Sequence, residues 1–306
     1  EQAGYAATFN DLFQDWVVAN ILDEDQGVYG YPNLEVQARA QQSVNQFSEI
    51  NSTIPQYSAE YLDLTSLAGP LRLRFQGPTE TELLPVEVGA PGCWWSNSGD
   101  SISSTLTRSV DLRGQSQATL QYQVWYNIEE DWDYGYVLVS VDQGKTWDLL
   151  ATAHTSPENP IGNSFGVGYT GVSSGWLKES IDLQAYAGQE ILLRFQYVTD
   201  DAVNGPGLCF RRISVPEVGR FDNDDPGWQA AGFVLINNKV KQDYIVQVIQ
   251  AGGDNQVTLL SLNQNNSGEM VVEPAAGIGR LMVAVAALAP QTQQGARYTL
   301  SIEPVN

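Results

Sequence analysis

Four carboxylates crowd into five residues of this chain. Glu129, Glu130, Asp131 and Asp133 stand directly before an apolar, strand-like run that begins at Tyr134. Carboxylates at this density can work as a general acid and base, hold a divalent cation through their oxygens, or remain solvated loop charge. The choice depends on which other reactive residues the chain has and which elements would bring them together.

The rest of the sequence supplies little for a catalytic centre. His154 is the only histidine, and the sequence has no His-Glu-x-x-His zinc motif, Cys-x-x-Cys pair, phosphate-binding loop or nucleophile elbow. Glu129 and Glu179 could be posed as the paired carboxylates of a glycosidase, but no pattern places them across a cleft. The sequence therefore predicts a protein without enzymatic activity.

The composition argues against two classes of partner. The chain has 306 residues and a formal net charge of −21, with 36 acidic residues against 15 lysines and arginines. Such a surface repels nucleic-acid phosphates and anionic membrane headgroups. No apolar run reaches the roughly 18 residues that a membrane span needs. We therefore expect neither nucleic-acid binding nor membrane insertion.

Other features indicate an exported protein. Lysine is scarce, whereas Asn, Gln, Ser, Thr, Trp and Tyr are frequent. Asn-x-Ser/Thr triplets at Asn51 and Asn265 are candidate glycosylation sites. The opening EQAGYAATF lacks an initiator methionine, and we interpret the chain as a processed piece of a longer precursor.

Apolar periodicity divides the chain into three parts. Residues 8–22 show the i, i+3, i+4, i+7 spacing of an amphipathic helix with Thr8 as its N-cap, and residues 34–50 are compatible with a weaker helix. From about residue 57 the period becomes two, and short strands alternate with turn residues. The prediction is a mainly β fold: a helical segment at 1–56, a jelly-roll β-sandwich at 57–219 and a small β-sandwich at 220–306.

Several blocks occur in an order that resembles a known family. They are WWSNSGDSISSTLTRSVDL, WYNIEEDWDYGYVLVSVDQGKTW, GNSFGVGYTG, WLKESIDLQAYAGQEILLRFQYVTDDAVNGPG and ISVPEVG. They resemble the jelly-roll module that follows the catalytic domain of bacterial immune inhibitor A-type metallopeptidases. The strands after residue 220 look like the β-sandwich that trails this module, and residues 8–22 look like the end of a degenerate peptidase-like domain. Catalysis in this family needs the His-Glu-x-x-His zinc motif, so the resemblance implies a bacterial extracellular or cell-surface location but not proteolysis.

The resemblance also implies a structural calcium ion. Similar modules bind calcium at one end of the sandwich with oxygens from three loops. The matching acids here are Asp100, Glu130, Asp133, Asp200 and Asp201. Solvated loop charge remains the alternative interpretation of these acids.

The last strand of the module departs from the family pattern. Relatives usually have Asp-Asp-Ile, whereas this chain has Arg211, Arg212 and Ile213. Two cations thus replace two carboxylates. Either the calcium site keeps fewer ligands, or Arg212 forms a salt bridge with the acids in place of the ion.

The jelly-roll topology bears on the cysteines and tryptophans. Cys93 and Cys209 fall in its first and last strands, which can lie side by side, so a disulfide is expected, with two buried thiols as the alternative. Most tryptophans alternate into strands and are expected in the core. Trp132 lies inside the acidic loop and is the candidate contact for a glycan.

Three functions are compatible with these features. The first hypothesis is a structural or adhesive subunit of a cell surface or extracellular filament, which associates with itself or with other extracellular proteins. The alternative is an accessory region of a secreted zinc metallopeptidase that positions substrate or stabilises the catalytic domain. A glycan-binding module is the third.

Overall fold

The computed structural model of the chain describes residues 7–31, 33–36, 38–221 and 225–305. The chain divides into two compact units, one formed by residues 1–83 together with 239–306 and the other by residues 84–238. We call them the terminal unit and the central unit. Among the described residues, no helix is long and apolar enough to cross a membrane.

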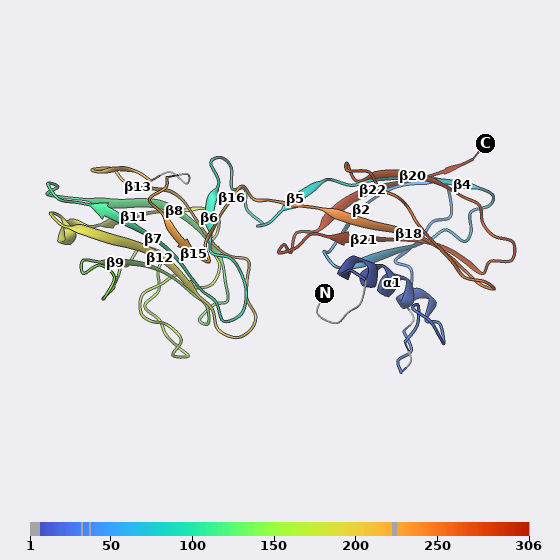
Figure 1. Cartoon of the computed structure of the whole chain (residues 1–306), viewed down its shortest axis with the longest axis horizontal. Helices are drawn as coiled ribbons and strands as arrows, with labels where there is room; N and C mark the ends of the chain where they lie inside the picture. Colours follow the sequence, from blue (N-terminus) through green and yellow to red (C-terminus); the bar gives the residue numbers. More distant parts are fainter. Residues whose placement is uncertain (1–6, 32, 37, 222–224, 306) are drawn as a thin grey trace. The chain divides into compact units, whose positions relative to one another are not determined.

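Two sheets enclose the core of the terminal unit. One has the order β1–β3–β21–β18–β19 and the other the order β2–β22–β4–β20, while β5 and β17 form a separate pair (Figure 1). Buried aliphatic side chains of both sheets, with Phe75, Tyr244 and Tyr298, fill the space between them. The strands are β1 (Gln42–Ser43), β2 (Ser48–Ile54), β3 (Ala59–Asp63), β4 (Leu71–Gln76), β5 (Glu80–Glu82), β17 (Lys239–Lys241), β18 (Asp243–Ala251), β19 (Gln256–Leu259), β20 (Ser267–Val272), β21 (Arg280–Leu288) and β22 (Ala296–Pro304).

This arrangement differs from the boundaries expected at residues 56 and 219. Strand β2 pairs antiparallel with β22 along its length, and β3 pairs with β21. The terminal sandwich therefore combines strands that precede the central unit in the sequence with strands that follow it. The expected second sandwich exists, but it needs partners from the N-terminal third of the chain.

Where a weaker helix was expected at residues 34–50, the described residues form loops, the short strand β1 and the first residues of β2. The buried Ile50 and Ile54 in β2 are four residues apart, and this spacing fits one face of a helix as well as one face of a strand. The β-branched residues of this segment favour the strand, and hydrogen bonding to β22 fixes it.

Helix α1 (Phe9–Leu22) forms where the sequence predicts it. Thr8 Oγ1 accepts a hydrogen bond from the Asp11 amide, and the Asp11 carboxylate accepts one from the Thr8 amide, which together make a capping box. The buried face of the helix, including Phe13, Val17 and Ile21, packs on apolar residues of β18 and β21.

The central unit is a sandwich of two largely antiparallel sheets. One sheet has the order β10–β9–β12–β7–β15, and the other has the order β11–β8–β13–β6–β16 with β14 paired to β13 (Figure 1). Their facing side chains form an aromatic-rich core. The strands are β6 (Cys93–Trp95), β7 (Ser103–Asp111), β8 (Thr119–Asn127), β9 (Tyr134–Ser140), β10 (Asp148–Leu149), β11 (Leu177–Asp182), β12 (Glu190–Val198), β13 (Gly207–Val215), β14 (Gly219–Arg220), β15 (Gln229–Ala231) and β16 (Val234–Ile236); a 3₁₀ turn, η1 (Gln184–Tyr186), follows β11.

Candidate functional site

Three loops meet at one end of the central unit. Asn127 pairs with Gly207, and Val198 pairs with both Ser103 and Tyr134. The loops β6–β7, β8–β9 and β12–β13 therefore leave the sheets at the same end. We call their meeting point the loop junction, and it contains the acids that the sequence singles out.

Hydrogen bonds hold the loop junction together. The Asp200 amide donates to Asp133 Oδ1 at 3.2 Å, and the Ser101 amide donates to the Asp200 carbonyl. Asn204 Nδ2 donates to Asp100 Oδ1. Asp100, Asp133 and Asp200 thus come from three different loops, and this network of hydrogen bonds joins each of them to a neighbouring loop.

Asp133 is the buried member of this network, with an exposure of 0%. The Tyr197 hydroxyl donates to Asp133 Oδ2 at 3.0 Å. Burial raises the pKa of Asp133, although the hydrogen bonds from Tyr197 and Asp200 oppose the shift. Burial and the nearby Asp133 charge also raise the pKa of Tyr197. Asp133 therefore links β12 to the β8–β9 loop from the inside.

Of the other predicted calcium ligands, Asp100, Glu130 and Asp201 are exposed and Asp200 is half-buried. Glu130 is exposed and lies beside Gly171, and Asp201 is exposed on the β12–β13 loop. Across the described ranges, no three acidic, histidine or cysteine side chains are grouped closely enough to hold a metal ion. Calcium at the loop junction therefore stays a prediction.

Arg211 and Arg212 do not take the place of a calcium ion. Arg211 Nε donates to Gln123 Oε1 at 2.9 Å, its Nη1 donates to the Val88 carbonyl, and its guanidinium lies 3.7 Å from the centre of the Trp176 ring. Arg212 is exposed and borders a hollow on the sheet face. Both arginines lie at mid-strand in β13, several residues from its loop-junction end at Gly207. The hypothesis that Arg212 neutralises the acidic cluster is therefore wrong.

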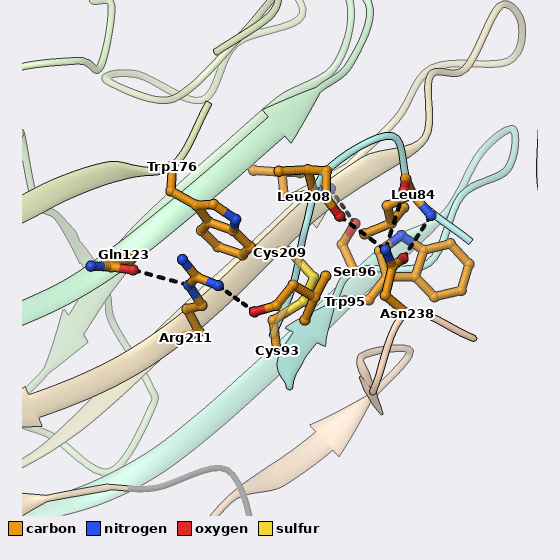
Figure 2. Close-up of a disulfide and its surroundings, with 12 residues drawn as sticks. Leu84, Cys93, Trp95, Ser96, Gln123, Trp176, Leu208, Cys209, Arg211 and Asn238 are labelled. Atoms are coloured by element: carbon orange, nitrogen blue, oxygen red, sulfur yellow. Dashed lines mark hydrogen bonds between the residues drawn. A yellow bond between two sulfur atoms is a disulfide. The ribbon is translucent and has the colours of Figure 1, made fainter. Parts of the chain in front are cut away.

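The expected disulfide is present. Cys93 in β6 and Cys209 in β13 are joined across neighbouring antiparallel strands, with their Cα atoms 5.7 Å apart. Figure 2 shows the bond beside Arg211 and Trp176. On the other side, the Leu208 amide donates to Ser96 Oγ, and the buried Asn238 side chain bonds the backbone of Leu84.

Trp132 is exposed, as expected from its position in the acidic loop, with 43% of its surface accessible. It borders a shallow hollow of about 540 Å³ together with polar residues of the loop junction, Ser101, Ser103, Thr199, Asp200 and Asp201, and with Asn163. An indole face beside carboxylates, an amide and hydroxyls can stack on a sugar ring and bond its hydroxyls.

Sequence reasoning missed a buried carboxylate cluster around Glu179. The Glu179 side chain is 2% exposed. Its Oε1 accepts hydrogen bonds from Tyr169 at 3.0 Å and Thr152 at 3.0 Å, and it lies 2.9 Å from His154 Nδ1. The Tyr169 hydroxyl is also 2.6 Å from that of Tyr122. The cluster ties the long β10–β11 loop to the core and separates Glu179 from solvent.

Burial dominates the titration of the tyrosines in this cluster. It raises the pKa of Tyr122 and that of Tyr169, and the neighbouring Glu179 charge adds to both shifts. Both hydroxyls therefore stay protonated and can act as donors. No local sequence pattern predicts the cluster, because its members come from β8, β11 and the β10–β11 loop.

The two glycosylation triplets lie in the terminal unit. Asn51 is on β2, where its side chain bonds Glu49 and Thr299. Asn265 is exposed in the β19–β20 connection, where its backbone bonds the Asn263 side chain.

Comparison with protein families places the central unit. Residues 77–235 match the model described as "Immune inhibitor A-like, MAM domain". The chain belongs to this family. The resemblance inferred from the sequence blocks is confirmed, and the matched MAM residues include both sheets, the disulfide and the loop junction.

Relatives with similar segments include three named proteins. Pre-pro-metalloprotease PrtV of Vibrio cholerae serotype O1 (strain M66-2) is 35% identical over 115 residues, which is 38% of this chain. Immune inhibitor A of Bacillus thuringiensis subsp. alesti is 27% identical over 58% of the chain, and Bacillopeptidase F of Bacillus subtilis (strain 168) is 36% identical over 29%. The matches cover 12%, 26% and 5% of these relatives' lengths, so this MAM chain spans about a quarter of them or less.

Proposed function

We propose that this chain is a non-catalytic accessory region of an extracellular metallopeptidase. The family match carries the proposal: relatives of the MAM module include a protein named as a metalloprotease and one named immune inhibitor A. The chain itself lacks the His-Glu-x-x-His motif that a zinc peptidase needs. Its role would then be to stabilise or position a catalytic domain that belongs to the same polypeptide.

Helix α1 offers a surface for that contact. Phe9 and Leu12 are 60% and 59% exposed, and Trp16 is 43% exposed. Phe9 stacks on Phe13, Phe13 stacks on Trp16, and Tyr57 packs edge-on against Phe9. Apolar side chains gathered in this way on a surface are typical of an interface. We infer that this aromatic face contacts the neighbouring peptidase domain.

The experiment compares the natural full-length protein with a variant in which Leu12 and Trp16 are both glutamine. The proposal predicts a lower melting temperature of the catalytic domain in the variant, because its contact loses buried apolar area. Exposed Val172→Gln in the central unit is the matched control, at 68% exposure. Equal melting of all three proteins would refute the proposed contact.

A glycan-binding role is the second candidate, and the hollow beside Trp132 favours it. Trp132→Ala should abolish binding of neutral glycans on a glycan array, whereas Trp147→Ala, which removes a ring packed on Arg194, should not. No binding by the unaltered chain would end this candidate.

The filament or adhesive role expected from the sequence stays a prediction. Isolated monomers in electron micrographs at high protein concentration would contradict it.

A further inference from the structure

The outer face of the β11–β8–β13 sheet carries a polar hollow of about 720 Å³. Side chains at alternate positions of β8, such as Tyr122 and Val124, point into the core, so their neighbours point outward. The hollow is bordered by Pro91 and by the outward-facing residues used below: Gln121, Gln123, Lys178, Ser180, Arg212 and Arg220.

A β-bulge places two consecutive arginines on this face. The register between β13 and β8 shifts between Arg211 and Ser214, and Arg212 has a left-handed φ of 53°. Without the extra residue, strand alternation would turn one of the arginines into the core. With it, Arg211 and Arg212 both face outward, and Ile213 returns to the core. Bulges commonly re-aim side chains next to binding sites.

The hollow concentrates positive charge in an acidic protein. Lys178, Arg212 and Arg220 are three of only 15 cations in a chain of net charge −21. None of the three forms an ion pair with a carboxylate within the part of the chain that the structure describes. Glu179 is the one acid among the described lining residues, and its carboxylate faces the core. Burial and the neighbouring Arg212 also lower the pKa of Arg211.

We propose that this hollow binds an acidic oligosaccharide. Its carboxylates would pair with Lys178, Arg212 and Arg220, whose guanidinium groups suit planar carboxylates. Its hydroxyls would bond the glutamine and serine side chains, which both donate and accept. The inference goes beyond the role proposed beside a peptidase, because it concerns binding by this chain alone.

Other anionic ligands fit the hollow less well. A peptide lying in the hollow could not pair with its central strand β8, because β8 is already paired with β11 and β13 on its two sides. A long polyanion such as nucleic acid would extend beyond the hollow over an acidic surface. A short oligosaccharide remains within roughly a Debye length of the three cations and senses their local field.

Calorimetric titration of the full chain tests the inference, with tetragalacturonate and a hyaluronan hexasaccharide as probes. We expect at least one acidic probe to bind. Methyl esterification of tetragalacturonate should lower its affinity about tenfold or more, because it removes the charge but keeps the sugar. Lys178→Gln, Arg212→Gln and Arg220→Gln should each weaken binding by about fivefold. Lys145→Gln, an exposed cation in the β9–β10 turn, should leave it unchanged.

Four outcomes would overturn the inference. The first is that neither acidic probe binds, and the second is that the methyl ester binds as tightly as tetragalacturonate. The third is that Lys145→Gln loses as much affinity as the three variants of the hollow. The fourth is that a pentaglutamate peptide binds more tightly than the sugar probes and depends on Arg212, which would assign the hollow to an acidic peptide instead. Melting curves of each variant that match those of the unaltered chain show that lost affinity does not come from unfolding. The three substitutions lie in different strands. If one variant misfolds, the affinities of the other two still test the inference.

Discussion

Replacing Glu179 with leucine should destabilise the central unit by about 3 kcal/mol. The carboxylate is buried and accepts hydrogen bonds from Tyr169 and Thr152, with His154 2.9 Å away. Leucine removes the acceptor of a buried tyrosine hydroxyl, and an unpaired buried donor costs about 1–3 kcal/mol. Loss of a charged acceptor from an enclosed network adds to this cost, whereas relief of carboxylate desolvation offsets part of it. Thr152 and His154 can form hydrogen bonds with water instead, so their loss of Glu179 adds little to the change in the free energy of unfolding.

Urea unfolding followed by tryptophan fluorescence measures this effect. Of the eight tryptophans only Trp16 lies outside the central unit, so the signal reports on the unit that contains Glu179. Glu179→Gln keeps an acceptor oxygen and should cost about 1–2 kcal/mol. His154→Ala, at 40% side-chain exposure, should cost less than about 1 kcal/mol, and exposed Glu158→Gln is the neutral control. A Glu179→Leu protein as stable as the unaltered chain would refute the reasoning, since the cluster would then contribute no net stability.

Three further predictions concern the disulfide and the loop junction. Replacing Cys93 and Cys209 with serine should cost up to about 4–5 kcal/mol in the same urea assay, because the bond closes a loop with a sequence separation of 116; an unchanged midpoint would contradict this. Because burial raises the folded pKa of Asp133 above its unfolded value, the native state holds the proton more tightly. The stability of the unaltered chain relative to Asp133→Asn, measured in EDTA, should therefore fall as the pH rises above about 4. A difference in stability that rises with pH would contradict this sign. If calcium binds at the loop junction, EDTA should lower the melting temperature by several degrees and Asp133→Asn should abolish that response; no shift with EDTA would count against the ion.

Local signals were sufficient for some elements of the fold. The α1 helix combines apolar periodicity with the Thr8–Asp11 capping box, and both are readable within a few residues. The Cys93–Cys209 bond followed from the topology that the resemblance implied, since the first and last strands of the module are neighbours. These features depend on short-range sequence pattern or on the family's strand order.

Long-range pairing set the limits of sequence reasoning. In the terminal unit, β2 pairs with β22 although the whole central unit lies between them in the sequence. No change in composition along the chain indicates such a pairing. The Glu179 cluster likewise depends on tertiary contacts, and the direction of Arg212 depends on a bulge that shifts the β13 register. The sequence therefore indicated which residues were unusual, such as the two arginines, but not which side of the sheet they face.

The central claim is that this MAM-containing chain serves as an accessory region in contact with a peptidase domain. Hydroxyl-radical footprinting of Phe9, Leu12 and Trp16 tests it most directly, because all three side chains are exposed in this chain. The measurement compares the isolated chain with the natural full-length protein, with exposed Trp132 as the internal reference. We predict that the α1 residues are protected in the full-length protein while Trp132 reacts equally in both. Equal reactivity of Phe9, Leu12 and Trp16 in the two proteins would contradict the account.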